Sequence, residues 1–209
     1  MVLDKLDEIQ WDDLRDSMGH PVTDVPEWIK LLLSNDEDTR RRAAINLGYS
    51  LFPHDQVSKV TLVATPFLIE LLDYEEPSNK GHILNILFLS FYFSEDTKCV
   101  QQFRDKIKSN PTYRDDYSIQ RLERELRVGK IIAEAIDSYI ALYTSPNWKT
   151  RHEVFRLIGK GPFPVKMWEK VDSSYEHFKA KEEHPQVLKF IAHVDAHRKS
   201  HHYRWQWKC

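Results

Sequence analysis

The most regular stretch of the chain is an apolar segment at residues 25–33, a polar turn at residues 34–38 and a second apolar pattern at residues 39–48. Within the second pattern, apolar side chains stand three, four and seven residues beyond Arg40, and Gly48 follows directly. Those offsets place three side chains on one face of an α-helix. The pattern therefore predicts a helix, a short turn and a second helix.

The same offsets recur three more times, beginning at Lys80, Arg151 and Val187. The intervals of 40 and 36 residues between successive starts suit a repeat of two helices, whereas the interval of 71 residues leaves room for an insertion. The third copy keeps the Arg and the Gly of the first, while the second has Lys80 and Phe88 in their places. We therefore predict a chain of repeated helix pairs.

On these residues, above all Arg40 to Gly48 and Arg151 to Gly159, the chain resembles the HEAT family of helical repeats. The run from Leu6 to Pro26 is also similar to the lead-in of bacterial HEAT-repeat proteins that mostly lack an assigned function. The resemblance implies an all-α fold, a HEAT-like α-α superhelix or solenoid of about four helix pairs with an inserted helical segment. It also implies that Arg40 pairs with a carboxylate in the adjoining helix or turn. The second helix of each pair would line a concave surface that faces a partner.

We expect a single helical-repeat domain over residues 1–209. Its expected parts are an N-terminal cap (1–22), repeats one and two (23–93), an insertion (94–128), repeat three (129–161), repeat four (162–200) and a tail (201–209). The cap should be a helix over residues 3–17, ended by the residues Gly19-His20-Pro21.

Three features of the pattern give sharper expectations. Pro66, inside the apolar pattern at residues 60–72, implies that a helix begins near Thr65 or is kinked there. Residues 83–93 are apolar nearly all round, which predicts a helix buried in the middle of the protein. Residues 119–142 keep helical spacing throughout and predict one long helix.

Charge and composition exclude several classes of protein. The 30 basic and 32 acidic residues give a net charge of −2, which argues against a general nucleic-acid binder. Two cysteines do not make a disulfide or metal-binding framework. No apolar run approaches the roughly 20 residues of a membrane span, and acidic residues stand where a signal peptide would carry positive charge. We expect a cytoplasmic protein that is a monomer or a weak dimer.

Candidate chemistry is sparse. His193 and His197 are four residues apart on one helix, with His201 and His202 following, and such a pair can hold a metal. No Glu stands between them as in the HExxH arrangement, so solvated or packing histidines are the alternative. No Gly-x-Ser-x-Gly motif occurs, and most acidic pairs lie in turns, where they cap helices. We predict no catalytic residue, no metal and no cofactor.

The remaining candidate is a binding surface on the second helices of the pairs. Its proposed contact residues are Arg41, Arg42, Asn46, His82, Asn85, His152, Arg156 and Lys189. Another protein would be the partner, and the protein would be a scaffold, or an antagonist such as an immunity protein of a secreted toxin. The alternative for these residues is an ordinary solvated face.

A second hypothesis is a nucleic-acid-binding protein, because some HEAT-like proteins are DNA glycosylases of alkylated bases. Such an enzyme needs a basic channel, aromatic side chains and a catalytic Asp. The tail alternates Tyr203, Trp205 and Trp207 with polar residues. That alternation is compatible with covering the open end of the repeats, with stacking on single-stranded nucleic acid, or with contacting a partner.

Overall fold

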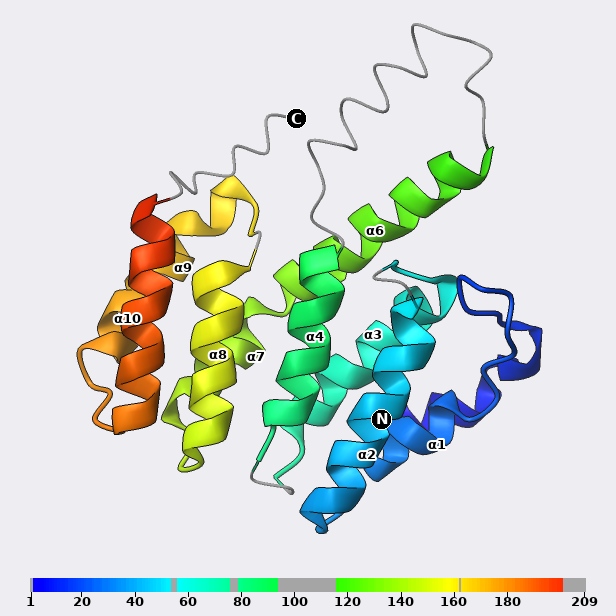
Figure 1. The fold of residues 1–209 in the computed structure, drawn as a ribbon, viewed down its shortest axis with the longest axis horizontal. Helices are drawn as coiled ribbons and strands as arrows, with labels where there is room; N and C mark the ends of the chain where they lie inside the picture. The colour runs from blue at the N-terminus through cyan, green and yellow to red at the C-terminus, as the bar shows by residue number, and fades with distance from the viewer. Residues whose placement is uncertain (1, 54–55, 76–78, 94–115, 162, 201–209) are drawn as a thin grey trace, which may run out of the picture.

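The computed structural model describes residues 2–53, 56–75, 79–93, 116–161 and 163–200, and every regular element in them is helical (Figure 1). One isolated β-bridge joins Arg15 to Pro21 beside Gly19, whose φ is 85°. The all-α prediction is therefore confirmed for these residues. Most of the expected insertion, at 94–115, and the tail at 201–209 lie outside them.

Four helices form a row in which neighbours pack side by side, with their N-terminal ends on the same side (Figure 1). In spatial order they are α2 (Glu37–Leu51), α4 (Gly81–Phe93), α8 (Trp148–Lys160) and α10 (Pro185–Ser200). They coincide with the four copies of the sequence pattern. Segments far apart in the sequence, α4 and α8 above all, therefore become direct neighbours.

The other helices form a second layer behind this row (Figure 1). They are α1 (Val25–Leu31), α3 (Lys59–Glu70) with η4 (Leu71–Asp73), α6 (Asp116–Glu134), α7 (Ile136–Ala141) with η6 (Leu142–Thr144), and η7 (Val165–Met167) with α9 (Trp168–Lys179). α1 packs on α2, α3 and α6 pack on α4, and α7 and α9 pack on α8. Helices α2, α4 and α8 of the row therefore each pack on at least one helix of the second layer, and α10 packs on α8.

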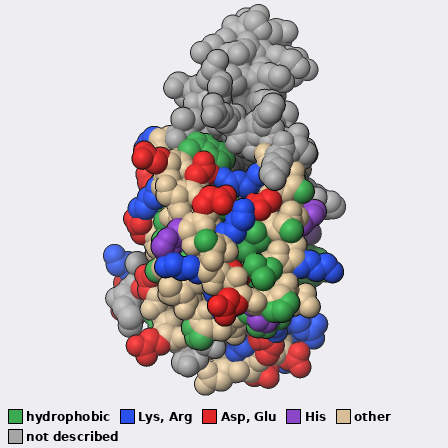
Figure 2. All heavy atoms as spheres, turned by 90° about the vertical axis from the view of Figure 1, so that its left-hand side faces the viewer, with side chains coloured by type: hydrophobic (Ala, Val, Ile, Leu, Met, Phe, Trp, Pro, Cys, Tyr) green, Lys and Arg blue, Asp and Glu red, His purple; other side chains and the backbone are tan. Residues whose placement is uncertain are grey.

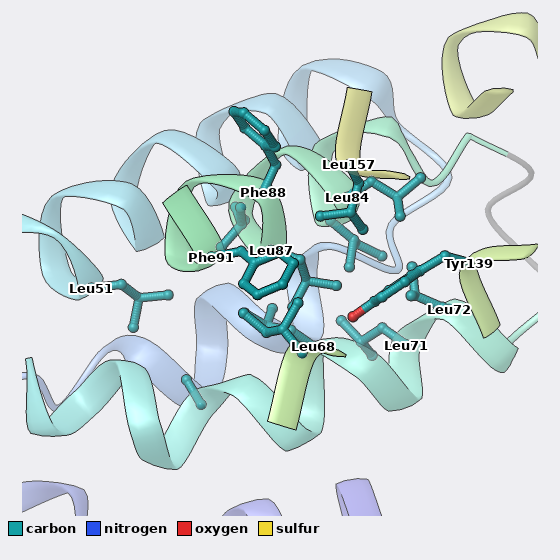
Figure 3. Close-up of a cluster of buried hydrophobic side chains, with 14 of the residues drawn as sticks. Leu51, Leu68, Leu71, Leu72, Leu84, Leu87, Phe88, Phe91, Tyr139 and Leu157 are labelled. Carbon is teal, nitrogen blue, oxygen red and sulfur yellow. The ribbon is translucent and has the colours of Figure 1, made fainter. Parts of the chain in front are cut away.

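One cluster of buried hydrophobic side chains runs between the two layers from Leu6 to Val194. α4 is at its centre, because it contacts α2, α3, α6 and α8. Figure 3 shows Leu84, Leu87 and Phe91 of α4 meeting leucines of α2 and of the α3–η4 segment, with Leu157 of α8 and Tyr139 of α7 close by. The prediction of a buried middle is confirmed for residues 83–91, the part of α4 whose side chains the structure describes.

The expected cap helix at residues 3–17 is wrong. The segment forms two 3₁₀ helices instead, η1 (Val2–Glu8) and η2 (Trp11–Asp13). The buried Trp11 indole donates a hydrogen bond of 2.8 Å to the carbonyl oxygen of Leu6. Folding the bulky ring under the chain in this way interrupts the α-helical path that the apolar spacing suggested.

A helix start near Thr65 is also wrong, because α3 begins at Lys59 and contains Pro66. Ser58 and Thr61 form a capping box, in which each side-chain oxygen accepts a hydrogen bond from the backbone N–H of the other. Pro66 is exposed. The cap fixes the earlier start, and the hydrogen bond that Pro66 cannot make is lost on the side facing water.

The long helix expected at residues 119–142 is broken at Ala135 into α6, α7 and η6. The change of direction lets α6 pack on α3 and α4 while α7 packs on α8. A single straight helix could not reach both sets of neighbours. α6 itself continues through residues 128 and 129, so no break in the backbone marks the expected end of the insertion.

The turns before α2 and α8 share one arrangement of polar groups. Arg40 Nη1 donates to the carbonyl oxygen of Ser34 at 2.6 Å, and Arg151 Nη1 donates to that of Ser145 at 2.8 Å. In each turn the Ser hydroxyl accepts from the backbone N–H two residues later, and that residue caps the helix with its own side chain. At the matching place before α4, Lys80 Nζ donates to the carbonyl oxygen of Leu71 at 3.3 Å.

The carboxylate partners of the two arginines differ. Arg151 donates to both carboxylate oxygens of Glu182, at 2.7 and 2.9 Å, in the turn between α9 and α10. Arg40 pairs with Glu37 in the first turn of its own helix, not with a carboxylate of an adjoining helix. Since Glu37 belongs to the expected turn at residues 34–38, the implied pairing of Arg40 with a carboxylate of the adjoining helix or turn is confirmed.

Shortening Leu87 to Ala should lower the free energy of unfolding by about 2 to 5 kcal/mol, because the side chain is fully buried at the centre of the core. Urea denaturation followed by circular dichroism measures the change. Leu188→Ala is the matched control, since this leucine is 42% exposed and its loss should cost less than about 1 kcal/mol. Equal losses for the two variants would contradict the position of α4 in the core.

Replacing Arg151 by Gln should lower the free energy of unfolding by about 2 to 4 kcal/mol, because it leaves the Glu182 carboxylate, with a side chain only 3% exposed, without its charged partner. Arg41→Gln removes an exposed ion pair with Asp38 and should change stability by less than about 1 kcal/mol. The same denaturation experiment compares the two. A loss at Arg151 no larger than at Arg41 would show that the turn does not depend on this arginine.

Candidate functional site

The eight predicted contact residues all lie on the helix row. Arg41, Arg42 and Asn46 are on α2, His82 and Asn85 on α4, His152 and Arg156 on α8, and Lys189 on α10. Arg41, Arg42 and Lys189 are exposed and the other five are half-buried. We define the row face as the exposed and half-buried side chains of these four helices.

Glu37 joins the starts of three helices of the row. Its carboxylate pairs with Arg40 of α2, accepts from Asn79 Nδ2 at 3.2 and 3.3 Å, and lies 3.4 Å from both His82 Nε2 and Lys149 Nζ. Of these neighbours, only His82 was among the predicted contact residues. Sequence reasoning treated Glu37 as one more acid at a helix start, because its partners are 42 and 112 residues away.

The cations around Glu37 keep it ionised. Burial alone would raise the pKa of this carboxyl group. Hydrogen bonds from Arg40 and Asn79 and the positive charges of Lys149 and Arg40 outweigh burial and lower the pKa from 4.5 to about 2. Glu37 is therefore a fixed negative charge at the end of the row face where α2, α4 and α8 begin.

Arg156 is a predicted residue whose side chain contacts the neighbouring helix α4. Its Nη1 donates to Asn85 Oδ1 at 2.7 Å and to Glu153 Oε2 at 3.1 Å, and its guanidinium carbon lies 4.2 Å from the centre of the Phe88 ring. The structure thus brings Asn85 and Arg156 together, as the prediction of a shared surface requires. Sequence reasoning missed Glu153 and Phe88, which hold the guanidinium in place.

His152 lies one turn before Arg156 on the same face of α8 and contacts α10. Its Nδ1 is 3.0 Å from Glu153 Oε1, and its ring centre is 4.1 Å from that of Phe190. Lys160 Nζ lies 5.6 Å from the centre of the same Phe190 ring. Arg41 pairs with Asp38 at 3.3 Å on α2, whereas Lys189 has no ion pair among the described residues.

Exposed hydrophobic side chains share the row face with these polar groups. Ile45 and Tyr49 are one turn apart on α2 and are 47% and 74% exposed, and Leu188 is an exposed residue in the first turn of α10. None of these three residues is among the eight predicted contact residues.

At the end of the molecule where α10 of the row and α9 of the second layer lie, acidic and basic side chains are interspersed (Figure 2). Lys179 Nζ pairs with Asp195 Oδ2 at 2.8 Å, and Arg198 pairs with Asp172. Burial raises the pKa of Tyr175, whose hydroxyl donates to Asp195, and the negative charge of Asp195 raises it further. These groups neutralise one another and do not form a basic channel.

Among the residues that the structure describes, no three His, Cys, Asp or Glu side chains are grouped as metal ligands. The His197 side chain and residues 201 and 202 lie outside them, so the candidate histidine cluster is not described as a whole. Within the same residues, no helix has both the length and the apolar character needed to cross a membrane. Comparisons with protein-family models, curated proteins and solved structures found no match to the chain.

Replacing Glu37 by Gln should make the free energy of unfolding depend less steeply on pH below about 5. Because the pKa of Glu37 in the folded state lies below its ordinary value, its ionised form stabilises the fold at neutral pH. That contribution is lost as the pH falls from about 5 to about 2, so the wild type should lose stability more steeply than Glu37→Gln. Urea denaturation at stepped pH measures both slopes.

Glu123→Gln, at an exposed position of α6, is the control for removing one carboxylate and should follow the wild-type slope. Parallel profiles for the wild type and Glu37→Gln would mean that the contacts of Glu37 add nothing to stability.

Proposed function

We propose that the protein is a non-catalytic protein-binding module that contacts its partner through the row face. The observation that carries this proposal is the placement of exposed hydrophobic side chains. Of the four large hydrophobic side chains that are exposed among the described residues, Ile45, Tyr49 and Leu188 belong to α2 and α10, and only Met18 lies elsewhere.

The physical reason is the cost of leaving such side chains in water. Tyr49, at 74% exposure, can bury most of its ring only against another molecule or a moving segment. Tyrosine and arginine are the residue types that contribute most often to protein–protein binding energy. Tyr49 and Arg156 lie on the same row face, together with neutral polar groups such as Asn46 and Asn85, so the face can combine apolar burial with directed hydrogen bonds.

The resemblance to HEAT repeats supports the same function. Stacked helix pairs present an extended surface on their second helices, and the row of α2, α4, α8 and α10 corresponds to those helices. A HEAT-like superhelix of this size would suit a scaffold or an antagonist, such as an immunity protein of a secreted toxin. That assignment rests on the kind of fold alone.

One observation favours the alternative, a nucleic-acid-binding or base-excising protein. Tyr49 is an exposed aromatic ring on which a base could stack. The acids of the row face weigh against it, because Glu37, Asp38 and Glu153 lie among the cations and pair with them. A phosphate backbone would meet negative charge along much of the face.

Replacing the exposed hydrophobic side chains of Ile45 and Tyr49 by acidic ones should abolish binding of the partner. We expect Ile45→Glu with Tyr49→Glu to reduce retention of the partner at least about tenfold in affinity capture from a lysate of the source organism. Thermal unfolding should stay within about 0.5 kcal/mol of the wild type, since both positions are exposed. Mass spectrometry of the retained proteins identifies the partner.

The matched control is Gln120→Glu with Ala141→Glu, which adds two acids at exposed positions of α6 and α7 in the second layer. This control should retain the partner at wild-type level. Retention of one stoichiometric protein by both double variants would mean that the row face is not the binding surface. Retention of nucleic acid alone, lost at high salt, would support the alternative function.

A further inference from the structure

Three side chains on the solvent side of α8 form a basic line. His152, Arg156 and Lys160 follow one another at intervals of four residues, so they lie along one face of the helix. Rings from the two neighbouring helices lie beside this line, Phe88 of α4 on one side and Phe190 of α10 on the other. The line therefore occupies the middle of the row face.

The two rings hold the cations without neutralising them. The Arg156 guanidinium carbon lies 4.2 Å from the centre of Phe88, and Lys160 Nζ lies 5.6 Å from the centre of Phe190. An aromatic face attracts a cation through its quadrupole and leaves the full positive charge available to another ion. Both side chains are thus positioned in advance, which lowers the entropy that a partner must remove.

The positive charge at this place is not balanced by acids. Arg156 and His152 share one carboxylate, that of Glu153, and no carboxylate among the described residues pairs with Lys160. Burial lowers the pKa of Lys160, and the nearby charge of Arg156 lowers it further. An anion placed between these cations would relieve their repulsion.

We propose that Arg156 and Lys160 form the recognition site for a carboxylate on a partner protein, within a segment that carries apolar side chains beside its acidic ones. This inference rests on the proposed function and names the chemistry of the partner. The apolar side chains of the partner would bury Ile45 and Tyr49 of α2 or Leu188 of α10, which are exposed on the same row face.

A carboxylate side chain suits the site better than a phosphate backbone does. Arg156 and Lys160 have only one carboxylate between them, that of Glu153 on Arg156, whereas Glu37 and Asp38 add negative charge at the end of the face where the helices begin. A nucleic acid places one phosphate after another along its length and would be repelled there. A protein segment can present one acid at Arg156 and Lys160 and apolar groups elsewhere.

The test uses two short, terminally blocked, fluorescein-labelled peptides of Leu, Ala and one acidic or neutral residue type. The acidic peptide carries Glu, and its counterpart carries Gln at the same places. Fluorescence anisotropy at low salt should show that the full-length protein binds the Glu peptide at least about tenfold more tightly than the Gln peptide. Arg156→Gln with Lys160→Met should remove that preference, while both new side chains still cover the rings.

Lys59→Gln with Lys166→Met is the matched control, because it removes two exposed cations outside the row and should keep the preference. The proposal is overturned by absence of binding to the Glu peptide, by equal binding of the Gln peptide, or by loss of binding in the control variant. It is also overturned if a labelled single-stranded oligonucleotide binds through Arg156 and Lys160 more tightly than the Glu peptide.

These outcomes separate the inference from the proposed function. If the captured partner is lost on Ile45→Glu with Tyr49→Glu but still binds Arg156→Gln with Lys160→Met, the row face binds protein and the carboxylate site is wrong. If the captured partner survives both pairs of changes, the row face itself is the wrong surface.

Discussion

Three cations at the starts of α2, α4 and α8, of which Arg40 and Lys80 are buried and Arg151 is half-buried, connect these helices of the row to the segments that precede them. A helix that ends leaves carbonyl oxygens without partners inside the helix, and these need other donors. Arg40, Lys80 and Arg151 supply them to the carbonyls of Ser34, Leu71 and Ser145. Before α2 and α8 the donor belongs to the following helix and its acceptor lies six residues earlier, so the contact positions the start of the helix close to the end of the segment before it. A contact of this kind is present at α2, α4 and α8 of the row.

The charges of these cations set much of the remaining polar structure. A nearly buried guanidinium requires a carboxylate, and the chain provides one in two ways. Glu182 comes from the next turn and closes α9 and α10 onto α8, whereas Glu37 comes from the same helix as Arg40. Glu37 then reaches Asn79, His82 and Lys149, so a charge needed locally also links three helices that are distant in sequence.

The neighbours of the cations on the row face change along the helices. Near the helix starts, acids and cations pair closely around Glu37 and Asp38. In the second half of α8, aromatic rings lie beside both Arg156 and Lys160, and while Arg156 also pairs with Glu153, no carboxylate among the described residues pairs with Lys160. A paired charge gains little from a new partner, whereas a charge held by a ring keeps its capacity to attract one. That difference, together with the exposed side chains of Ile45 and Tyr49, is the physical reason for proposing that the partner binds at Arg156 and Lys160.

The sequence alone determined which segments form α2, α4, α8 and α10, because burial on one side of a helix repeats with the helical period and leaves a mark in every copy. It also placed Arg40 at a turn, and it placed Asn85 and Arg156 on one surface. It failed where a particular side-chain contact, rather than the period of burial, decided the outcome. Trp11 folds beneath η1, Ala135 breaks a helix that must reach two sets of neighbours, and Glu37 and Phe88 acquire their roles from residues brought close only by folding. Periodicity records which side of a helix is buried, but only the tertiary structure decides which charge or ring that side meets.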